Sequence, residues 1–440
     1  MKSQNPTTTS DGDAFILPED IRYKCLMDGA CCRDTWEIRV EGEAAERIMD
    51  SDWRSCTDLP EKVRSPFVRS RTRAKHLLFR RNGEACCFLG EENKCRLHEK
   101  YGFEFKPHVC RRFPWRFIQT PGGVYVGLSF ACNSVLRDEG PPVSQSREEA
   151  LWIYEHAPEH QAIRQPILLD AKTEIDWESY LLIEAVLDQI FGYEEENFAT
   201  CLVAGHVWLG MLRRLIETVL YEAGEQKKNR EPNPDEKAEL IRQSIINFIH
   251  KTQEDGYRRA WAIAKKPVAN AALKRMTLGT FLSFRNSLRP RQWRITALAR
   301  VIFQNVRHLL RVGSLRMKPL EKRVSWSKLD PKPEVLFPEE SQKLLRRYYR
   351  HALFRKDLIV HTDLFWGYGY FLLAYGLMEY YASGLEALGE ADNALALSLV
   401  EKYFVHHSSF NQTFLYHPAI AHVFQYLFRR PNFAHTIVYG

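Results

Sequence analysis

The sequence lacks a segment that could cross a membrane or direct secretion. The longest uncharged stretch near the C-terminus runs from Leu364 to Met378, between Asp363 and Glu379. It is shorter than the roughly 20 apolar residues that a spanning helix needs. Residues 1–20 contain no apolar run behind a basic start, so no signal peptide is expected. We therefore expect a soluble, cytoplasmic protein that makes no contact with a membrane.

Cysteine is almost absent from residues 133–440, which contain only Cys201. Cytoplasmic thiols stay reduced, so a disulfide framework is not expected. Soft thiolates gathered at one end of a chain indicate a metal or iron–sulfur site instead. The other nine of the ten cysteines are Cys25, Cys31, Cys32, Cys56, Cys86, Cys87, Cys95, Cys110 and Cys132.

The chain also lacks the Cys-x2-Cys spacing that is common in zinc sites. Cys95-x2-His98 is its one pair of zinc-finger type. Adjacent cysteines, as in Cys31-Cys32 and Cys86-Cys87, point apart where the backbone is extended, so both rarely bind one small ion. A cluster of several irons tolerates such spacing better, because each iron needs one thiolate. The spacing favours an iron–sulfur cluster and leaves zinc open.

No glycine-rich nucleotide-binding motif is present. No G-x-G-x-x-G follows an expected strand, and strands do not alternate with helices as a doubly wound cofactor domain requires. Gly367 and Gly369 lie inside an aromatic helical run and predict close helix packing instead. The aromatic side chains of residues 365–381 are expected in the core.

Gly140-Pro141-Pro142 predicts a domain boundary. Before it, residues 1–15 are expected to form a flexible tail and residues 16–140 a small cysteine-rich α+β domain that binds a metal. Alternating apolar positions at 115–119 and 124–130, on either side of Pro121-Gly122-Gly123, predict a β-hairpin in this domain.

Residues 141–440 are expected to form a larger, all-helical domain with a sub-boundary near residues 330–338, so the fold class is predominantly α. Ser146-Arg147-Glu148-Glu149 predicts a capping box at a helix start. Asn233-Pro234 predicts an N-cap followed by proline at the first helical position. Apolar periodicity predicts further helices at 175–191, 201–221, 292–310, 339–353, 363–383, 391–405 and 417–429.

Residues 62–81 contain eight Lys or Arg side chains and no acid. Such a run is most often a solvated loop. Two other interpretations stay open: contact with nucleic acid or phosphate, and stabilisation of nearby thiolates by positive charge.

The cysteine spacing resembles that of a known family, the zinc- or iron-chelating cysteine-cluster (YkgJ-like) family. The similarity covers residues 20–135, and beyond residue 140 it is one of length and helical character only. The matching motifs are Cys25-x5-Cys31-Cys32, Cys87-Phe88-Leu89, Cys95-x2-His98, Cys110-Arg111-x-Phe113-Pro114 and Cys132.

Within that family, the order Cys31-Cys32-x3-Trp36-x-Ile38 is similar to the start of the flagellin lysine N-methylase group, whose members carry a long helical C-terminal part. The resemblance implies a [4Fe–4S] cluster and methyl transfer from S-adenosylmethionine to lysine side chains of a protein substrate. The metal ligands that it implies are Cys25, Cys31, Cys32, Cys87, Cys95, Cys110 and Cys132. Whether Cys86 and His98 belong to the ligand set is left open.

Cys56 and Cys201 match no motif position, and isolated cysteines are most often small buried apolar residues. The competing hypothesis is a non-catalytic zinc- or iron-binding scaffold whose helical part binds a partner. Nucleic acid is the least favoured partner.

Overall fold

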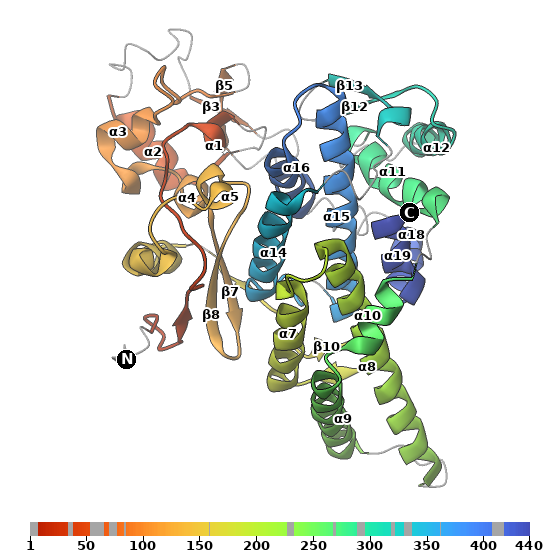
Figure 1. Ribbon diagram of the computed structural model, residues 1–440. Coiled ribbons are helices and arrows are strands. Elements are labelled where there is room, and N and C mark those ends of the chain that lie inside the picture. Colours follow the sequence, from red (N-terminus) through yellow and green to blue (C-terminus); the bar gives the residue numbers. More distant parts are fainter. Residues whose placement is uncertain are drawn as a thin grey trace. The chain divides into compact units, whose positions relative to one another are not determined.

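The chain is described by a computed structural model, shown in Figure 1. The ranges that the structure describes are 8–33, 38–52, 66–69, 77–82, 85–157, 159–226, 233–266, 270–287, 295–317, 322–329, 337–360, 362–406 and 418–440.

The chain divides into two compact units. Unit 1 comprises Met1–Phe117, Val126–His160 and Arg289–Gln292. Unit 2 comprises Ile118–Tyr125, Gln161–Leu288 and Trp293–Gly440. Nine of the ten cysteines fall within unit 1 and one within unit 2.

The strands of the N-terminal part are short and belong to three small sheets. Their orders are β1-β8-β7-β9, β2-β4-β3 and β5-β6. The strand bounds are β1 Phe15–Ile16, β2 Arg39–Val40, β3 Phe67–Arg69, β4 Leu77–Phe79, β5 Arg81–Asn82, β6 Ala85–Cys86, β7 Trp115–Thr120, β8 Gly123–Leu128 and β9 Gln161–Ala162.

Short helical turns connect these strands. The α-helices are α1 Ala30–Arg33, α2 Gly42–Asp50, α3 Arg96–Tyr101, α4 His108–Arg112, α5 Asn133–Arg137 and α6 Arg147–Glu155, and the 3-10 turns are Phe103–Phe105 and Val143–Ser146.

The β-hairpin predicted around Pro121-Gly122-Gly123 is present as β7 and β8. Gly123 has a φ of 117°, a conformation open to glycine and costly for other residues. The capping box predicted at Ser146 is wrong. α6 does begin at Arg147, but the Ser146 side chain makes no capping hydrogen bond. Ser146 ends a 3-10 turn, and its backbone is not in the extended conformation that an N-cap residue usually adopts.

Unit 2 is built from helices, with two small hairpins. The hairpins pair β10 Ile167–Leu168 with β11 Glu174–Ile175, and β12 Ser314–Met317 with β13 Lys322–Ser325. Its helices are α7 Trp177–Gly192, α8 Phe198–Gln226, α9 Pro234–Glu254, α10 Arg258–Ala264, α11 Ala271–Ser287, α12 Ile295–Leu309, α14 Glu339–Phe354, α15 Leu364–Ala387, α16 Asn393–Val400, α18 Pro418–Phe428 and α19 Pro431–Tyr439, with a 3-10 turn at Trp326–Lys328 and a π-helical turn at Glu401–His406.

Side-chain caps fix where several of these helices begin. The predicted cap at Asn233 is confirmed: its side chain accepts from the Glu236 N–H, Glu236 reaches back to the Asn233 N–H, and Pro234 opens the helix. Asp363 caps α15 in the same way by accepting from the Trp366 N–H at 2.8 Å.

The core of unit 2 is organised around α15, on which α8, α11, α16, α18 and α19 pack (Figure 1). Every residue of α15 from Leu364 to Leu385 is buried, so the predicted burial of its aromatic residues is confirmed. A Cβ atom on Gly367 would lie 2.0 Å from the Leu358 carbonyl oxygen, and one on Gly369 would lie 2.4 Å from the Phe428 ring. The close packing predicted from these two glycines is therefore confirmed.

The prediction of a predominantly α fold is confirmed. No helix in the described ranges has the length and apolar character that crossing a bilayer requires. Most of the linker expected at 330–338 lies outside the described residues.

Candidate metal centre

The cysteines of unit 1 lie at the ends of short elements. Cys31 and Cys32 are in α1, directly after Gly29, which has a φ of +69°. A Cβ atom on Gly29 would lie 2.9 Å from the Asn93 carbonyl oxygen, so glycine allows α1 to approach the loop before Cys95.

A tight loop brings Cys86-Cys87 and Cys95 to neighbouring positions. Leu89 and Cys95 form an isolated antiparallel bridge. The Arg96 N–H donates to the Phe88 carbonyl at 2.9 Å, and the Gly90 N–H donates to the Lys94 carbonyl at 2.9 Å. Backbone hydrogen bonds thus hold the return of the chain at Cys95.

Two of the thiols belong to residues at helix N-termini. Cys95 and Cys132 are the N-cap residues of α3 and α5, and neither side chain makes a capping hydrogen bond. Burial raises the pKa of Cys95, and the nearby backbone N–H groups of His98 and Leu97 lower it. Burial raises the pKa of Cys132 to about 12, against the lowering effect of the Val135 and Ser134 backbone. Backbone N–H groups at a helix N-terminus favour the thiolate, which is the form that binds metals.

Five of the thiols share one core: Cys86 and Cys87 are buried in it, and Cys32, Cys95 and Cys110 pack against it. Burial raises the pKa of Cys110 well above its ordinary value, and Cys86, Cys95 and Cys31 raise it further. A hydrogen bond with Cys31 is the largest cause of the raised pKa of Cys32, followed by burial and then by Cys31, Cys86 and Cys95.

The remaining cysteines extend the same group. Cys31 and Cys25 both act on the pKa of Cys132. Cys86 forms a side-chain hydrogen bond with Cys87, which is the largest cause of its own raised pKa. We call the eight residues Cys25, Cys31, Cys32, Cys86, Cys87, Cys95, Cys110 and Cys132 the thiol cluster.

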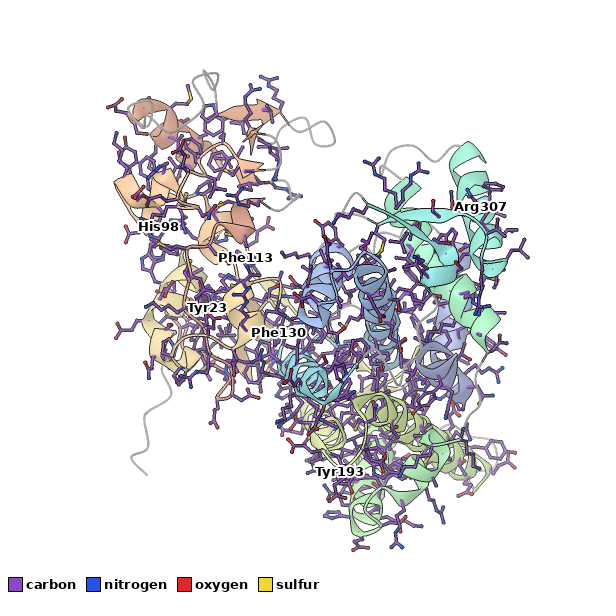
Figure 2. The ribbon with its side chains drawn as sticks, turned by 45° about the horizontal axis from the view of Figure 1, so that its top comes forward. Tyr23, His98, Phe113, Phe130, Tyr193 and Arg307 are labelled. Atoms are coloured by element: carbon purple, nitrogen blue, oxygen red, sulfur yellow. The ribbon has the colours of Figure 1, made fainter. Side chains whose placement is uncertain are left out.

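The thiol cluster is buried at one end and exposed at the other. Cys86 and Cys87 are buried in a core that includes Phe79, Phe88 and Leu97. Cys25 and Cys31 are exposed. Tyr23, labelled in Figure 2, is buried and meets the Trp115 ring edge-on at 5.4 Å. Its pKa is raised by burial first and then by Cys25 and Cys132. The exposed end is where a ligand from solution could reach the sulfurs.

Among the described residues, Lys106 and Arg81 bring positive charge to the cluster. Lys106 lowers the pKa of Cys31 and opposes the burial effect at Cys95 and Cys110. From within the basic run at 62–81, Arg81 acts in this way on Cys86. The sequence analysis did not identify Lys106 as a residue that acts on the thiols. Its position just before Pro107, in the segment that leads into Cys110, could have indicated this role. Lys62, Arg64, Arg71, Arg73 and Lys75 lie outside the described residues.

Two sequence-based expectations about cysteine geometry differ from the structure. The side chains of Cys31 and Cys32 do not point apart: both lie in helix α1 and are hydrogen-bonded to each other. Cys86 and Cys87 are also hydrogen-bonded through their side chains. The spacing of adjacent cysteines therefore no longer favours an iron–sulfur cluster over a single zinc ion.

Cys201 lies in unit 2, fully buried, where an Arg346 guanidinium N–H donates to its sulfur at 3.4 Å. Cys56 lies outside the described residues. The His98 ring meets the Phe103 ring edge-on at 5.9 Å, and burial followed by Lys106 lowers its pKa. His98 is therefore neutral at physiological pH, the form that can bind a metal.

The donor chemistry of the cluster fits a soft metal or an iron–sulfur centre, because thiolate sulfur is the ligand that such centres prefer. In the part of the chain that the structure describes, however, no three His, Cys, Asp or Glu side chains are already arranged to hold a metal ion.

Comparisons of the chain with protein-family models, with curated proteins and with solved structures found no match.

Proposed function

We propose that the thiol cluster of unit 1 binds a thiolate-ligated metal centre, with a [4Fe–4S] cluster as the first candidate and zinc as the alternative. The observation that carries the proposal is a convergence in packing: Cys32, Cys95 and Cys110 pack against the core that buries Cys86 and Cys87. Hydrogen bonds from Lys24 to Ser134 and from Asn133 to Asp28 hold the neighbours of Cys25 and Cys132 together. Cys31, Cys32, Cys87, Cys95 and Cys110 belong to the same set of predicted ligands.

Burial of apolar residues alone gives a weaker account of this convergence. A cysteine can serve as a small apolar residue, but such residues need neither backbone N–H donors nor a neighbouring ammonium. Here the backbone at the starts of α3 and α5 lowers the pKa of Cys95 and Cys132, and Lys106 lowers the pKa of Cys31 and opposes the burial effect at Cys95 and Cys110. Both features favour thiolates, which a metal requires.

Anaerobic purification of the full chain separates the two metals. A brown protein with broad absorption near about 400 nm, as thiolate-bound iron gives, together with iron and acid-labile sulfide, supports the iron–sulfur cluster. A colourless protein with stoichiometric zinc supports the alternative. A protein with neither metal after reconstitution would contradict both.

The activity that we propose for an iron–sulfur form is methyl transfer from S-adenosylmethionine to lysine side chains of a protein. Its support is the resemblance of the motifs around Cys31 and Cys110, together with the exposed end of the cluster at Cys25 and Cys31. A cluster with one open iron could bind the amino and carboxylate groups of S-adenosylmethionine there. Transfer also requires the acceptor amine to be neutral, so a proton must leave it before methylation.

Calorimetry with S-adenosylmethionine tests this activity. The cluster-loaded wild-type chain should bind it, and a Cys110→Ala variant should not. Cluster-loaded protein that fails to bind S-adenosylmethionine would leave the non-catalytic metal-binding scaffold as the function.

A further inference from the structure

The positive charge of the chain is concentrated in a segment unrelated to the thiol cluster. Residues 256–320 contain fifteen Lys or Arg side chains and no Asp or Glu. The net charge of the whole chain is +7, so the remaining residues carry +7 − 15 = −8. This segment includes α10, α11, α12 and β12 of unit 2. Lys274 is buried beside Glu379 and adds no surface charge, but so basic a segment still favours an anionic partner.

Helix α12 faces its own unit with polar and aromatic groups. Asn305 donates to the Thr280 hydroxyl of α11 at 3.1 Å. The His308 ring stacks on Trp326 at 4.1 Å and forms a hydrogen bond with the Tyr380 hydroxyl of α15 at 3.1 Å. This side of the helix is already satisfied by contacts within unit 2.

The opposite side of α12 is apolar and exposed. The exposed fractions are 55% for Ile302, 59% for Phe303, 46% for Val306 and 67% for Leu310. Positions 302, 306 and 310 recur every four residues and therefore share one helix face. Val312, just past the helix, is 58% exposed. We call these five residues the outer face of α12.

A helix in a water-soluble unit normally buries such a stripe and exposes its polar side. Helix α12 does the reverse, so its outer face has the composition of a contact surface. Basic side chains border it: the Arg307 guanidinium, labelled in Figure 2, lies 5.5 Å from the centre of the Phe303 ring, and Arg311 follows Leu310 in sequence.

Charge and apolar character together select among the partners that could cover this face. A second copy of the chain, packed face to face, would bring two acid-free segments together and be repelled. Nucleic acid offers phosphates for the arginines but leaves the aliphatic stripe in water. An anionic bilayer satisfies both features, because Phe and Leu enter the headgroup boundary while Arg and Lys pair with lipid phosphates.

We propose that the outer face of α12 docks unit 2 on an anionic lipid surface, with the helix lying in the plane of the interface. This contact needs no spanning helix. If it forms, the sequence-based expectation of no membrane contact holds only for membrane crossing. It is independent of the metal centre and of methyl transfer.

Co-sedimentation of the full chain with vesicles tests the proposal. Vesicles of phosphatidylcholine and phosphatidylglycerol in equal amounts should bind the chain at least about tenfold more tightly than phosphatidylcholine alone, since each basic side chain near the surface contributes about fivefold. The double variant Phe303→Ser/Leu310→Ser should bind anionic vesicles at least about tenfold more weakly. Because both side chains are exposed, the variant should keep the thermal stability of the wild type.

Tyr221→Ser/Val423→Ser is the matched control. Its two side chains are also in unit 2, outside the outer face, and are 68% and 56% exposed. This control should bind anionic vesicles as the wild type does. Equal binding to both lipid mixtures, equal loss in both double variants, or no vesicle binding would each overturn the proposal. So would a concentration-dependent dimer that Phe303→Ser/Leu310→Ser abolishes without any lipid binding.

Discussion

The side-chain nitrogen of Lys356 lies 3.9 Å from the centre of the Tyr125 ring. The lysine is 1% exposed and forms an ion pair with Glu184. Three further rings surround its ammonium within 5.9 Å, those of Trp177, Tyr180 and Phe354. The ammonium thus joins the hairpin tip, α7 and the end of α14 within unit 2, and cation–π attraction adds to the ion pair.

Replacing Lys356 by methionine should destabilise the fold strongly. The variant would leave the buried Glu184 carboxyl without its ammonium partner. Removing one partner of a buried ion pair costs about 3–5 kcal/mol of stability. Urea denaturation of the full chain measures the change in the free energy of unfolding. The double variant Lys356→Met/Glu184→Gln should recover part of the loss, and Lys172→Ala, at an exposed lysine, should stay within about 0.5 kcal/mol of wild type. A loss in Lys356→Met no larger than in Lys172→Ala would contradict this account.

A second buried ion pair joins α11 to α15. The Lys274 side-chain nitrogen lies 2.9 Å from a Glu379 carboxylate oxygen. Both side chains are almost fully inaccessible, at 1% and 0%. Glu379→Gln should destabilise unit 2 by about 3–5 kcal/mol, because it leaves the lysine charge buried alone. Lys274→Met/Glu379→Leu should come close to wild type or exceed it, since apolar replacements remove the desolvation cost of both charges. A double variant that is less stable than Glu379→Gln would refute this interpretation.

The same pair predicts a pH dependence. Burial raises the pKa of Glu379 from its ordinary value of 4.5 to about 7, while Lys274 opposes the shift. The folded state therefore holds this proton more tightly than the unfolded state. The stability from this proton is fully present below about pH 4.5 and is lost as the pH rises through about 7. Lys274→Met/Glu379→Leu should lack this contribution, so the stability difference between variant and wild type should change between pH 5 and 7.5. A difference that is flat over this range would show that Glu379 does not titrate there.

Gly367 should not tolerate alanine. A Cβ atom at position 367 would lie 2.0 Å from the Leu358 carbonyl oxygen. Such a clash with the backbone costs about 3 kcal/mol or more at a site that cannot relax. Gly210, in α8, has open space around it, so Gly210→Ala should stabilise the helix by about 0.5–1 kcal/mol. Thermal denaturation of both variants should show opposite shifts in Tm. Shifts of the same sign and size would indicate that α15 and Leu358 do not pack as described.

Local signals predicted much of the fold because their causes are local. The Asn233-Pro234 start of α9 and the Pro121-Gly122-Gly123 turn each depend on residues next to one another in sequence. Ser146 failed as a cap because the preceding residues form a 3-10 turn, which the capping pattern does not reveal.

Other features depend on tertiary contacts and could not be read from the sequence. Helix α11 was missed, and its buried Lys274 is explained by Glu379 and the Val438 carbonyl, both more than a hundred residues away. Periodicity correctly predicted α12 but not its orientation, because the polar side that packs inward is stabilised by Tyr380 and Trp326. At the candidate metal centre, the nine-to-one distribution of cysteines pointed to the sequence that forms most of unit 1. The contribution of Lys106 and the pairing of adjacent thiols required the folded structure.

The most direct test of the metal centre is the metal content per chain of two cysteine variants purified anaerobically beside the wild type. Cys110→Ser removes a predicted ligand in the thiol cluster, and Cys201→Ser removes the buried cysteine of unit 2. The account predicts about four irons and four sulfides per wild-type chain, or about one zinc in the alternative. It predicts the same content in Cys201→Ser and a clear loss in Cys110→Ser, with circular dichroism confirming that both variants stay helical. Equal metal content in the two variants, or a wild-type chain that binds neither metal, would contradict it.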